Sequence, residues 1–153
     1  MATEVDDKRV EHDRYDVRAR RELESFSTDK MTMLGSQQFA EYLREPYYFF
    51  ESVLKNKLSG DHRVLEIGAG SGQHTAVLVE SGASVVATDI SPNSLKLLEY
   101  RFIQHKNIYV ETKVADMENI PFEDESFDFI VCAGSLSYGD NDIVIENIYK
   151  KLK

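Results

Sequence analysis

The stretch that decides the fold is residues 63–75, RVLEIGAGSGQHT. A short apolar run, broken only by Glu66, leads into Gly68, Gly70 and Gly72 at alternate positions. Glycine permits a positive φ angle and lets a ligand approach the main chain closely. A strand that passes through such a turn into a helix places the turn at the carboxyl end of the strand, where open α/β sheets bind their ligands.

The sequence on either side of this turn predicts an open α/β sheet of parallel strands. Residues 1–30 are polar, and we expect residues 1–10 to be disordered. Helices are expected at 11–26 and at 36–58, the second one interrupted or kinked near Pro46. Strands are then predicted at 64–67, 84–89, 108–114 and 127–134, and helices at 73–81, 92–105 and 140–152. This alternation is typical of a parallel sheet covered by helices.

Composition narrows the classes of partner. The chain has 153 residues, enough for one domain with a real core, and a formal net charge of −9. That charge argues against nucleic acid or an anionic membrane as the main partner, because both require clustered Lys and Arg. Cys132 is the only cysteine, which excludes an intrachain disulfide and a cysteine-based zinc site, and we expect no metal. The charged start has no apolar signal sequence, so we expect a cytoplasmic protein.

Two classes of ligand fit a glycine turn in this position. A dinucleotide would place its pyrophosphate there, but its fingerprint is G-x-G-x-x-G, and here the third glycine comes one place early. S-adenosylmethionine has no phosphate, and its cationic groups need acceptors such as Glu66. Its carboxylate would meet N–H groups at the start of the next helix. The absence of Lys and Arg from 64 to 95 favours this second ligand.

Acidic residues after the next two strands extend the argument. Asp89 closes the second predicted strand, 17 residues after Gly72, where a carboxylate can bind ribose hydroxyls of either ligand. Asp116 and Met117 follow the third strand, where an acid can accept from an adenine amino group and an apolar side chain can cover the ring. Hydride transfer gives no comparable reason for an acid there. The sequence therefore favours S-adenosylmethionine.

At this point the sequence resembles the class I S-adenosylmethionine-dependent methyltransferases, and within them the small-molecule group called methyltransferase type 11. Four stretches carry the resemblance in order: VLEIGAGSG at 64–72, TDIS at 88–91, ADMENIPFEDESFDFIV at 115–131 and CAGSLSY at 132–138. It implies a Rossmann-like sheet, S-adenosylmethionine as cofactor, S-adenosylhomocysteine as product and a small-molecule methyl acceptor.

The resemblance also implies a role for individual residues. The methionine end of the cofactor would be lined by Glu66, Gly68, Ala69 and Gly70. Gly72 would let a helix pack closely. The nucleoside would be held by Asp89 at the ribose, Ile90 at the adenine face, and Asp116 with Met117 at the adenine rim. The floor of the methyl-donating centre would be formed by Cys132, Ala133 and Ser135.

No catalytic residue is identified in this way. Many relatives have a histidine just after the fourth strand, where this chain has Tyr138. His74 either faces the cofactor or lies on a helix surface, and Tyr15 either closes on the cofactor or packs against the domain. Because methyl transfer is an in-line displacement at an activated carbon, orientation and exclusion of water lower much of its barrier without a dedicated base.

The predicted organisation is an N-terminal helical lid over residues 1–58 and a cofactor-binding domain over 59–153. The family's sheet has seven strands in the order 3-2-1-4-5-7-6, so a chain with four is expected to be truncated after strand four. An apolar strand four left at the edge predicts a possible homodimer through that edge. The alternatives to a methyltransferase are an NAD-dependent oxidoreductase and a non-catalytic S-adenosylmethionine-binding module.

Overall fold

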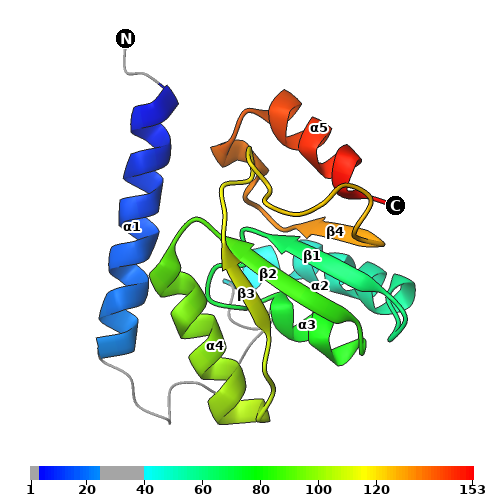
Figure 1. The fold of residues 1–153 in the computed structure, drawn as a ribbon. Helices are drawn as coiled ribbons and strands as arrows, with labels where there is room; N and C mark the ends of the chain where they lie inside the picture. Colours follow the sequence, from blue (N-terminus) through cyan, green and yellow to red (C-terminus); the bar gives the residue numbers. More distant parts are fainter. Residues whose placement is uncertain (1–3, 25–39) are drawn as a thin grey trace.

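The computed structural model describes residues 4–24 and 40–153. Its centre is a four-stranded parallel sheet in the order β3-β2-β1-β4 (Figure 1). The strands are β1 Arg63–Ile67, β2 Ser84–Asp89, β3 Glu111–Val114 and β4 Phe129–Cys132. In the middle of the sheet Leu65 of β1 pairs with Val86 of β2 and with Ile130 of β4. The predicted α/β class, parallel sheet and order of the first four strands are confirmed.

The helices between the strands follow the sequence signals closely. They are α3 Thr75–Glu80, α4 Pro92–Lys106 and α5 Asn141–Lys151, with a short 3₁₀ helix η3 at Leu136–Tyr138. Ser91 caps α4, because its hydroxyl accepts from the Ser94 N–H at 3.0 Å, and Pro92 occupies the first turn. Asp140 caps α5 in the same way, accepting from the Asp142 and Ile143 N–H groups.

Three predicted elements of the sheet region begin two or more residues before the observed ones. Helix α3 begins at Thr75 and not at residue 73, because the glycine turn continues through His74. Strand β3 begins at Glu111, the residue that pairs with Val86, and not at 108. Strand β4 begins at Phe129 and ends at Cys132, and Gly134 beyond it has a positive φ of 80°. In each case the sheet or helix ends where its hydrogen-bonding partners end.

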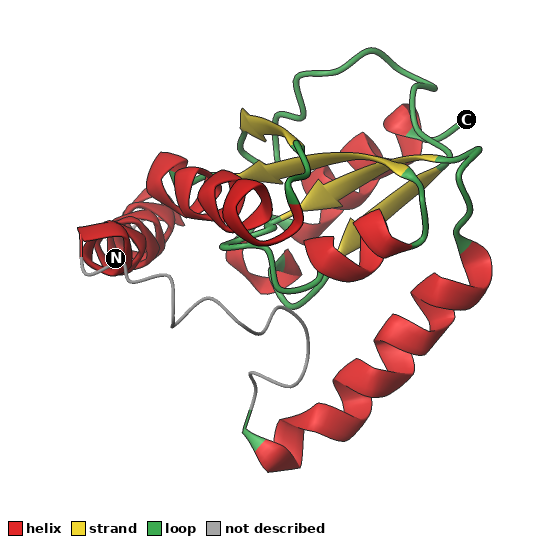
Figure 2. Ribbon diagram, turned by 90° about the horizontal axis from the view of Figure 1, so that it is seen from below, coloured by secondary structure: helices red, strands yellow, loops and turns green. Residues whose placement is uncertain are grey.

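The two faces of the sheet are covered by different segments, which makes three layers (Figure 2). Side chains alternate between the faces along each strand. Val64, Val85 and Val131 pack against α2 and α3, while Ala87 packs against α3 and α4. The opposite face is covered by the segment from Met117 to Phe127 and by Ile148 of α5, which pack on Leu65, Ile67 and Val86.

The N-terminal helices differ from the prediction in their limits. Helix α1 spans Glu4–Glu24, so residues 4–10, which were expected to be disordered, are helical. Phe26, the predicted end of that helix, lies outside the described residues, as do residues 36–39 at the predicted start of the second. Helix α2 spans Glu41–Lys57 without interruption at Pro46. Pro46 stands early in the helix and is exposed, so the carbonyl that it leaves without an N–H donor is near solvent.

The segment just before β4 meets the last residues of the chain. Phe127 and Leu152 form an isolated parallel bridge, and the Lys153 N–H donates to the Phe127 carbonyl at 3.0 Å. The Glu125 and Phe127 N–H groups donate to the Lys150 and Lys151 carbonyls. This pairing lies just before β4. A homodimer through the β4 edge stays a prediction, as does the domain boundary at residues 58 and 59.

Within residues 4–24 and 40–153, no helix combines the length and the apolar character that crossing a bilayer requires.

Candidate functional site

A hollow of about 180 Å³ lies at the carboxyl ends of the strands, and it is named the first hollow here. Its walls come from the glycine turn, the ends of β2 and β3, the segment after β4, and α1. Nine of the residues predicted for the site line it: Tyr15, Gly68, Gly70, Asp89, Ile90, Asp116, Met117, Ala133 and Ser135. Segments separated by more than one hundred residues thus meet at one place, as expected for a parallel sheet.

Asp89 links the glycine turn to the second strand. One of its carboxylate oxygens accepts from the Gly70 N–H at 2.8 Å, and the other accepts from the Ser91 N–H at 2.8 Å. Burial raises the pKa of Asp89 above its ordinary value, although these backbone donors oppose the shift. Each carboxylate oxygen can accept more than one hydrogen bond, so Asp89 keeps acceptor capacity toward the hollow.

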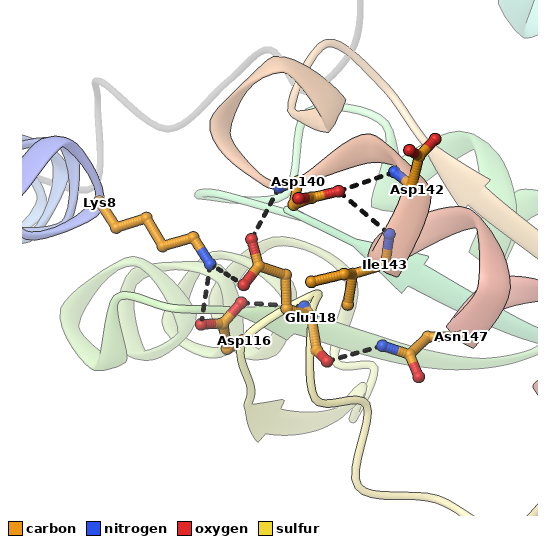
Figure 3. A network of polar contacts seen from close by, with 7 residues as sticks. All are labelled: Lys8, Asp116, Glu118, Asp140, Asp142, Ile143 and Asn147. Atoms are coloured by element: carbon orange, nitrogen blue, oxygen red, sulfur yellow. Dashed lines mark hydrogen bonds and ion pairs between the residues drawn. The ribbon is translucent and has the colours of Figure 1, made fainter. Parts of the chain in front are cut away.

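Asp116 belongs to a polar network at the other end of the first hollow (Figure 3). The Lys8 ammonium of α1 pairs with Glu118 and lies 3.6 Å from Asp116 Oδ2. Asp116 Oδ1 accepts from the Glu118 N–H at 2.9 Å, and Glu118 Oε1 accepts from the Asp140 N–H at 2.7 Å. The hydrogen bond from Lys8 holds the pKa of Glu118 below its ordinary value. This network fastens α1 and the start of α5 to the segment after β3.

Glu66 does not line the hollow, which corrects the expectation of direct contact with a ligand. Its side chain lies on the face of the sheet covered by α3, is only 2% exposed, and accepts from the Thr75 hydroxyl at 2.5 Å. Burial raises the pKa of Glu66 to about 8, and the nearby Asp89 carboxylate adds to the shift, while Thr75 opposes it. Glu66 therefore joins β1 to α3 beneath the site.

Two further predicted residues also lie outside the hollow. Gly72 has a φ of 94°, and a Cβ there would lie 3.0 Å from Leu98 and 3.1 Å from Phe102. It allows close packing of a helix as expected, but the helix is α4. Cys132 ends β4 with its Sγ 3.0 Å from the Ser135 Oγ, and it packs in the core on the α5 face. Cys132 is therefore not among the residues that line the first hollow.

A second hollow of about 460 Å³ adjoins the first. The two share part of the glycine turn, the residues after β4 and one residue each of α1 and α4: Tyr15, Gly68, Gly70, Ser94, Ala133 and Gly134. Ala69, the remaining predicted residue, lines only the second hollow, together with Ser71, Gln73 and Arg101. The predicted methionine end of the site is therefore divided between two connected spaces.

His74 lines the second hollow and is buried, so the expectation of a helix-surface histidine is wrong. Its ring stacks on Tyr47 at 5.0 Å and meets Phe50 edge-on at 5.5 Å. Its Nδ1 lies 3.5 Å from Glu51 Oε1. Burial lowers the pKa of His74, although Glu51 opposes the shift, so the ring is neutral at pH 7. The segment after the glycine turn thus rests against α2.

Helix α1 contributes residues that sequence reasoning missed. Lys8, Glu11 and His12 line the first hollow with Tyr15, and Arg18 and Glu22 line the second. They recur at intervals of three or four residues, which places them on one face of the helix. This polar stripe was present in the sequence, but nothing in the sequence showed what it faces. Tyr15 donates to or accepts from Tyr138 at 3.1 Å, so it reaches the segment after β4.

Comparison with known proteins relates the chain to methyltransferases. A family model described as "Methyltransferase domain" matches residues 64–153. An uncharacterized methyltransferase-like protein of Schizosaccharomyces pombe is 32% identical over 59% of this chain and 34% of its own length. A demethylmenaquinone methyltransferase of Clavibacter sepedonicus is 37% identical over 54% of this chain and 31% of its own length. The aligned part of the chain spans about a third of the length of these relatives.

Solved structures agree on the fold. A Pyrococcus horikoshii protein superposes with a TM-score of 0.65 and 22% identity, covering 84% of this chain and 62% of its own. A SAM-dependent methyltransferase from Methanosarcina mazei superposes with a TM-score of 0.57 and 29% identity, covering 66% of this chain and 52% of its own. Together with the family match, the likeness to the Methanosarcina mazei methyltransferase implies S-adenosylmethionine as the cofactor and S-adenosylhomocysteine as its product.

Proposed function

The chain belongs to the methyltransferase domain family, and we propose that the protein transfers a methyl group from S-adenosylmethionine to a small-molecule acceptor. The observation that carries this proposal is the meeting of Asp89 and Asp116 in one hollow beside Gly70. These carboxylates come from the ends of neighbouring strands, and apolar Ile67, Ile90 and Met117 complete the lining between them.

The residues of the first hollow suit a nucleoside. Asp89 offers acceptors to vicinal hydroxyl groups, and Asp116 offers an acceptor to an exocyclic amine. Gly70 has a φ of 55°, and a Cβ there would find only Gln73 within 4 Å, at 3.8 Å, so the main chain is open to a ligand at this point. In this proposal Asp89, Ile90, Asp116 and Met117 hold the nucleoside, while Gly68, Gly70 and Ala133 lie beside the reacting end.

Bound S-adenosylmethionine supplies a methyl carbon activated by a positively charged sulfur. The work left to the chain is to bind, to orient the acceptor and to exclude water, which together lower much of the barrier to such a displacement. Helix α1 suits the last task, because its Lys8, Glu11, His12 and Tyr15 line the first hollow. The predicted role of residues 1–58 as a lid is part of this proposal.

Three observations support a small-molecule acceptor. One of the relatives is named a demethylmenaquinone methyltransferase, so a protein that shares this domain acts on a small molecule. The net charge of −9 also disfavours a nucleic acid. Ligand pockets of 300–1,000 Å³ are usual for small molecules, and the second hollow, at about 460 Å³, falls in that range.

Isothermal titration calorimetry with S-adenosylhomocysteine tests the proposal. We expect the wild-type chain to bind it and Asp89→Ala to bind it at least ~10-fold more weakly, because hydrogen bonds to a charged group contribute about 1.5–3 kcal/mol. Asp61→Ala, at an exposed position outside both hollows, is the matched control. Binding of NADH with no response to S-adenosylhomocysteine would instead favour an oxidoreductase.

A further inference from the structure

Helix α2 is apolar on two of its faces. On the inner face, Phe50 and Leu54 pack in the core with Val64 of β1 and Val77 of α3. The outer face carries a second row of apolar residues, named the apolar stripe here: Tyr42, Pro46, Phe49 and Val53. In Figure 2, α2 is the helix at the lower right, on the outside of the molecule. A helix that packs on its domain through one face is expected to be polar on the other, so the apolar stripe calls for a second partner.

The apolar stripe has the spacing of a helix that pairs with another helix. Its residues follow one another at intervals of four, three and four, which are the alternating a and d positions of a heptad. Tyr42 is 81% exposed and Phe49 is 72% exposed, so both rings stand open to solvent. Pro46 and Val53 between and beyond them are exposed as well. A continuous row of exposed apolar residues that includes aromatic rings is typical of a protein–protein interface.

The order of residues in the apolar stripe fits a second copy of the same helix. Intervals of four, three and four read the same in both directions, so an antiparallel copy matches every residue of the stripe with another. Tyr42 then lies beside Val53 of the second copy, and Phe49 lies beside its Pro46. Each layer of the contact combines a large ring with a smaller side chain, which is how well-packed layers are built. A surface that complements itself in this way is what a two-fold dimer requires.

The charges of α2 favour the antiparallel orientation. The first turns carry Glu41, Arg44 and Glu45, which give a net negative charge, and the last turn carries Lys55 and Lys57. In an antiparallel pair the acidic start of each helix stands by the basic end of the other, and the two helix dipoles oppose each other. A parallel pair would bring charges of the same sign together at both ends.

We propose that two copies of the chain associate through the apolar stripe of α2, with the two helices antiparallel about a two-fold axis between Pro46 and Phe49. The inference is independent of the proposed function. It also differs from the homodimer predicted at the β4 edge, because the contact lies on a helix and leaves the backbone groups of that edge as they are. The net charge of −9 opposes the approach of two copies, and physiological ionic strength screens this repulsion.

Sedimentation equilibrium at physiological ionic strength tests the contact. We expect the wild-type chain to show a monomer–dimer equilibrium and Phe49→Glu to raise its dissociation constant at least ~10-fold, because a carboxylate in an apolar contact loses hydration without gaining a partner. Phe49 is exposed in the single chain, so the variant keeps its core, and circular dichroism verifies its fold. Tyr149→Glu is the matched control, at an aromatic residue 80% exposed on α5. A monomeric wild-type chain, or a dimer that Phe49→Glu weakens no more than Tyr149→Glu does, would overturn the inference.

Disulfide cross-linking tests the orientation. The antiparallel pair brings Tyr42 of one copy beside Val53 of the other, whereas the two copies of Tyr42 stand eleven residues, or about 16 Å, apart along the helices. A disulfide requires Cα atoms within about 7 Å of each other. Oxidation of a mixture of Tyr42→Cys and Val53→Cys should therefore give a covalent dimer, and oxidation of either variant alone should not. Wild type serves as the control for Cys132. A covalent dimer from Tyr42→Cys alone and none from the mixture would contradict the antiparallel pair.

Discussion

The two hollows share a wall but are built in different ways. Among the polar groups of the first hollow, Asp89 closes β2 and Asp116 follows β3, while Lys8 and Glu11 come from α1. Those of the second hollow stand mainly on helix faces, with Arg18 and Glu22 on α1 and Arg101 on α4. The hydrogen bonds of the sheet fix the positions of Asp89 and Asp116. The positions of the helix residues in the second hollow depend on how α1 packs against α4. The two strand-end aspartates of the first hollow therefore depend on the topology of the sheet, and the polar groups of the second hollow depend on helix packing.

The largest expected effect is a loss of stability on substitution of Gly68, which lines both hollows. Gly68 has a φ of 68°, and a Cβ added there would lie 2.2 Å from the Ser135 Oγ. We expect Gly68→Ala to lower the free energy of unfolding by roughly 3 kcal/mol, from backbone strain plus the clash. Gly70→Ala is the control, since its Cβ would meet no atom closer than 3.8 Å, and about 1 kcal/mol is expected. Urea denaturation measures both, and equal losses would contradict the clash.

The next effect concerns Glu66, the buried acid beneath the first hollow. Burial raises the pKa of Glu66 to about 8 from 4.5, so the folded chain holds a proton that the unfolded chain releases. The stability that this proton provides is complete below pH 4.5 and is lost as the pH rises to 8. Relative to wild type, Glu66→Gln should gain nothing below pH 4.5 and roughly 2–3 kcal/mol above pH 8. Denaturation across this range measures the gain, with the exposed Glu123→Gln as the control.

A smaller effect is expected when the hydrogen bonds of Asp16, which hold α1 beside both hollows, are removed. Asp16 accepts from the Ser91 hydroxyl at 2.9 Å and from the Asn93 N–H and side-chain amide at 3.1 and 2.8 Å. We expect Asp16→Ala to lower the free energy of unfolding by about 1–2 kcal/mol and to speed amide hydrogen exchange throughout α1. Asp13→Ala, an exposed aspartate on the same helix, is the control. Unchanged exchange in α1 would show that other contacts hold the helix.

The Asp16 contact also has a pH dependence. Burial acts to raise the pKa of Asp16, but the hydrogen bonds from Ser91 and Asn93 outweigh it and hold the pKa below 3.8. A lowered pKa means that the stabilisation is present above pH 3.8 and is lost as the pH falls through the folded value. The difference between wild type and Asp16→Ala should therefore shrink in acid.

The smallest effect is expected at Tyr15, which lines both hollows. The Tyr15 and Tyr138 hydroxyls are 3.1 Å apart, and this hydrogen bond raises the pKa of Tyr15 to about 12. Tyr15→Phe keeps the ring and should cost about 0.5 kcal/mol, because the hydroxyl pair is partly exposed. In an alkaline absorbance titration the variant should lack a tyrosine that ionises near pH 12. A titration curve identical to wild type would contradict the assigned pKa.

The sequence predicted the first hollow well, because strand ends are positions that a sheet brings together. Asp89 and Asp116 could be placed by their order after apolar runs. The same reasoning failed for Glu66, one residue before the end of β1. Side chains alternate between faces, so Ile67 reaches the hollow while Glu66 points toward α3. The end of a strand shows at which edge of the sheet a residue lies. The face of the sheet to which its side chain points depends on the exact residue.

The second hollow could not be predicted from the sequence in this way. Arg18 and Arg101 are 83 positions apart, and each is one of several basic residues on its helix. They meet because α1 lies along α4, which no local pattern in the chain specifies (Figure 1). Arg18 belongs to a basic run, residues 18–21, that is interleaved with acids and is typical of a solvated helix surface.

The polar stripe of α1 fixes the distance between two contacts that differ in their chemistry. Lys8, at one end, stands by Asp116, and Glu22, at the other, stands by Arg101, so fourteen residues of helix span about 21 Å. One residue inserted between Tyr15 and Arg18 would rotate every later side chain by about 100° and take Arg18 off the stripe, while Lys8 kept its place. The length of α1 therefore sets the separation between its contact with Asp116, after β3, and its contact with Arg101 of α4.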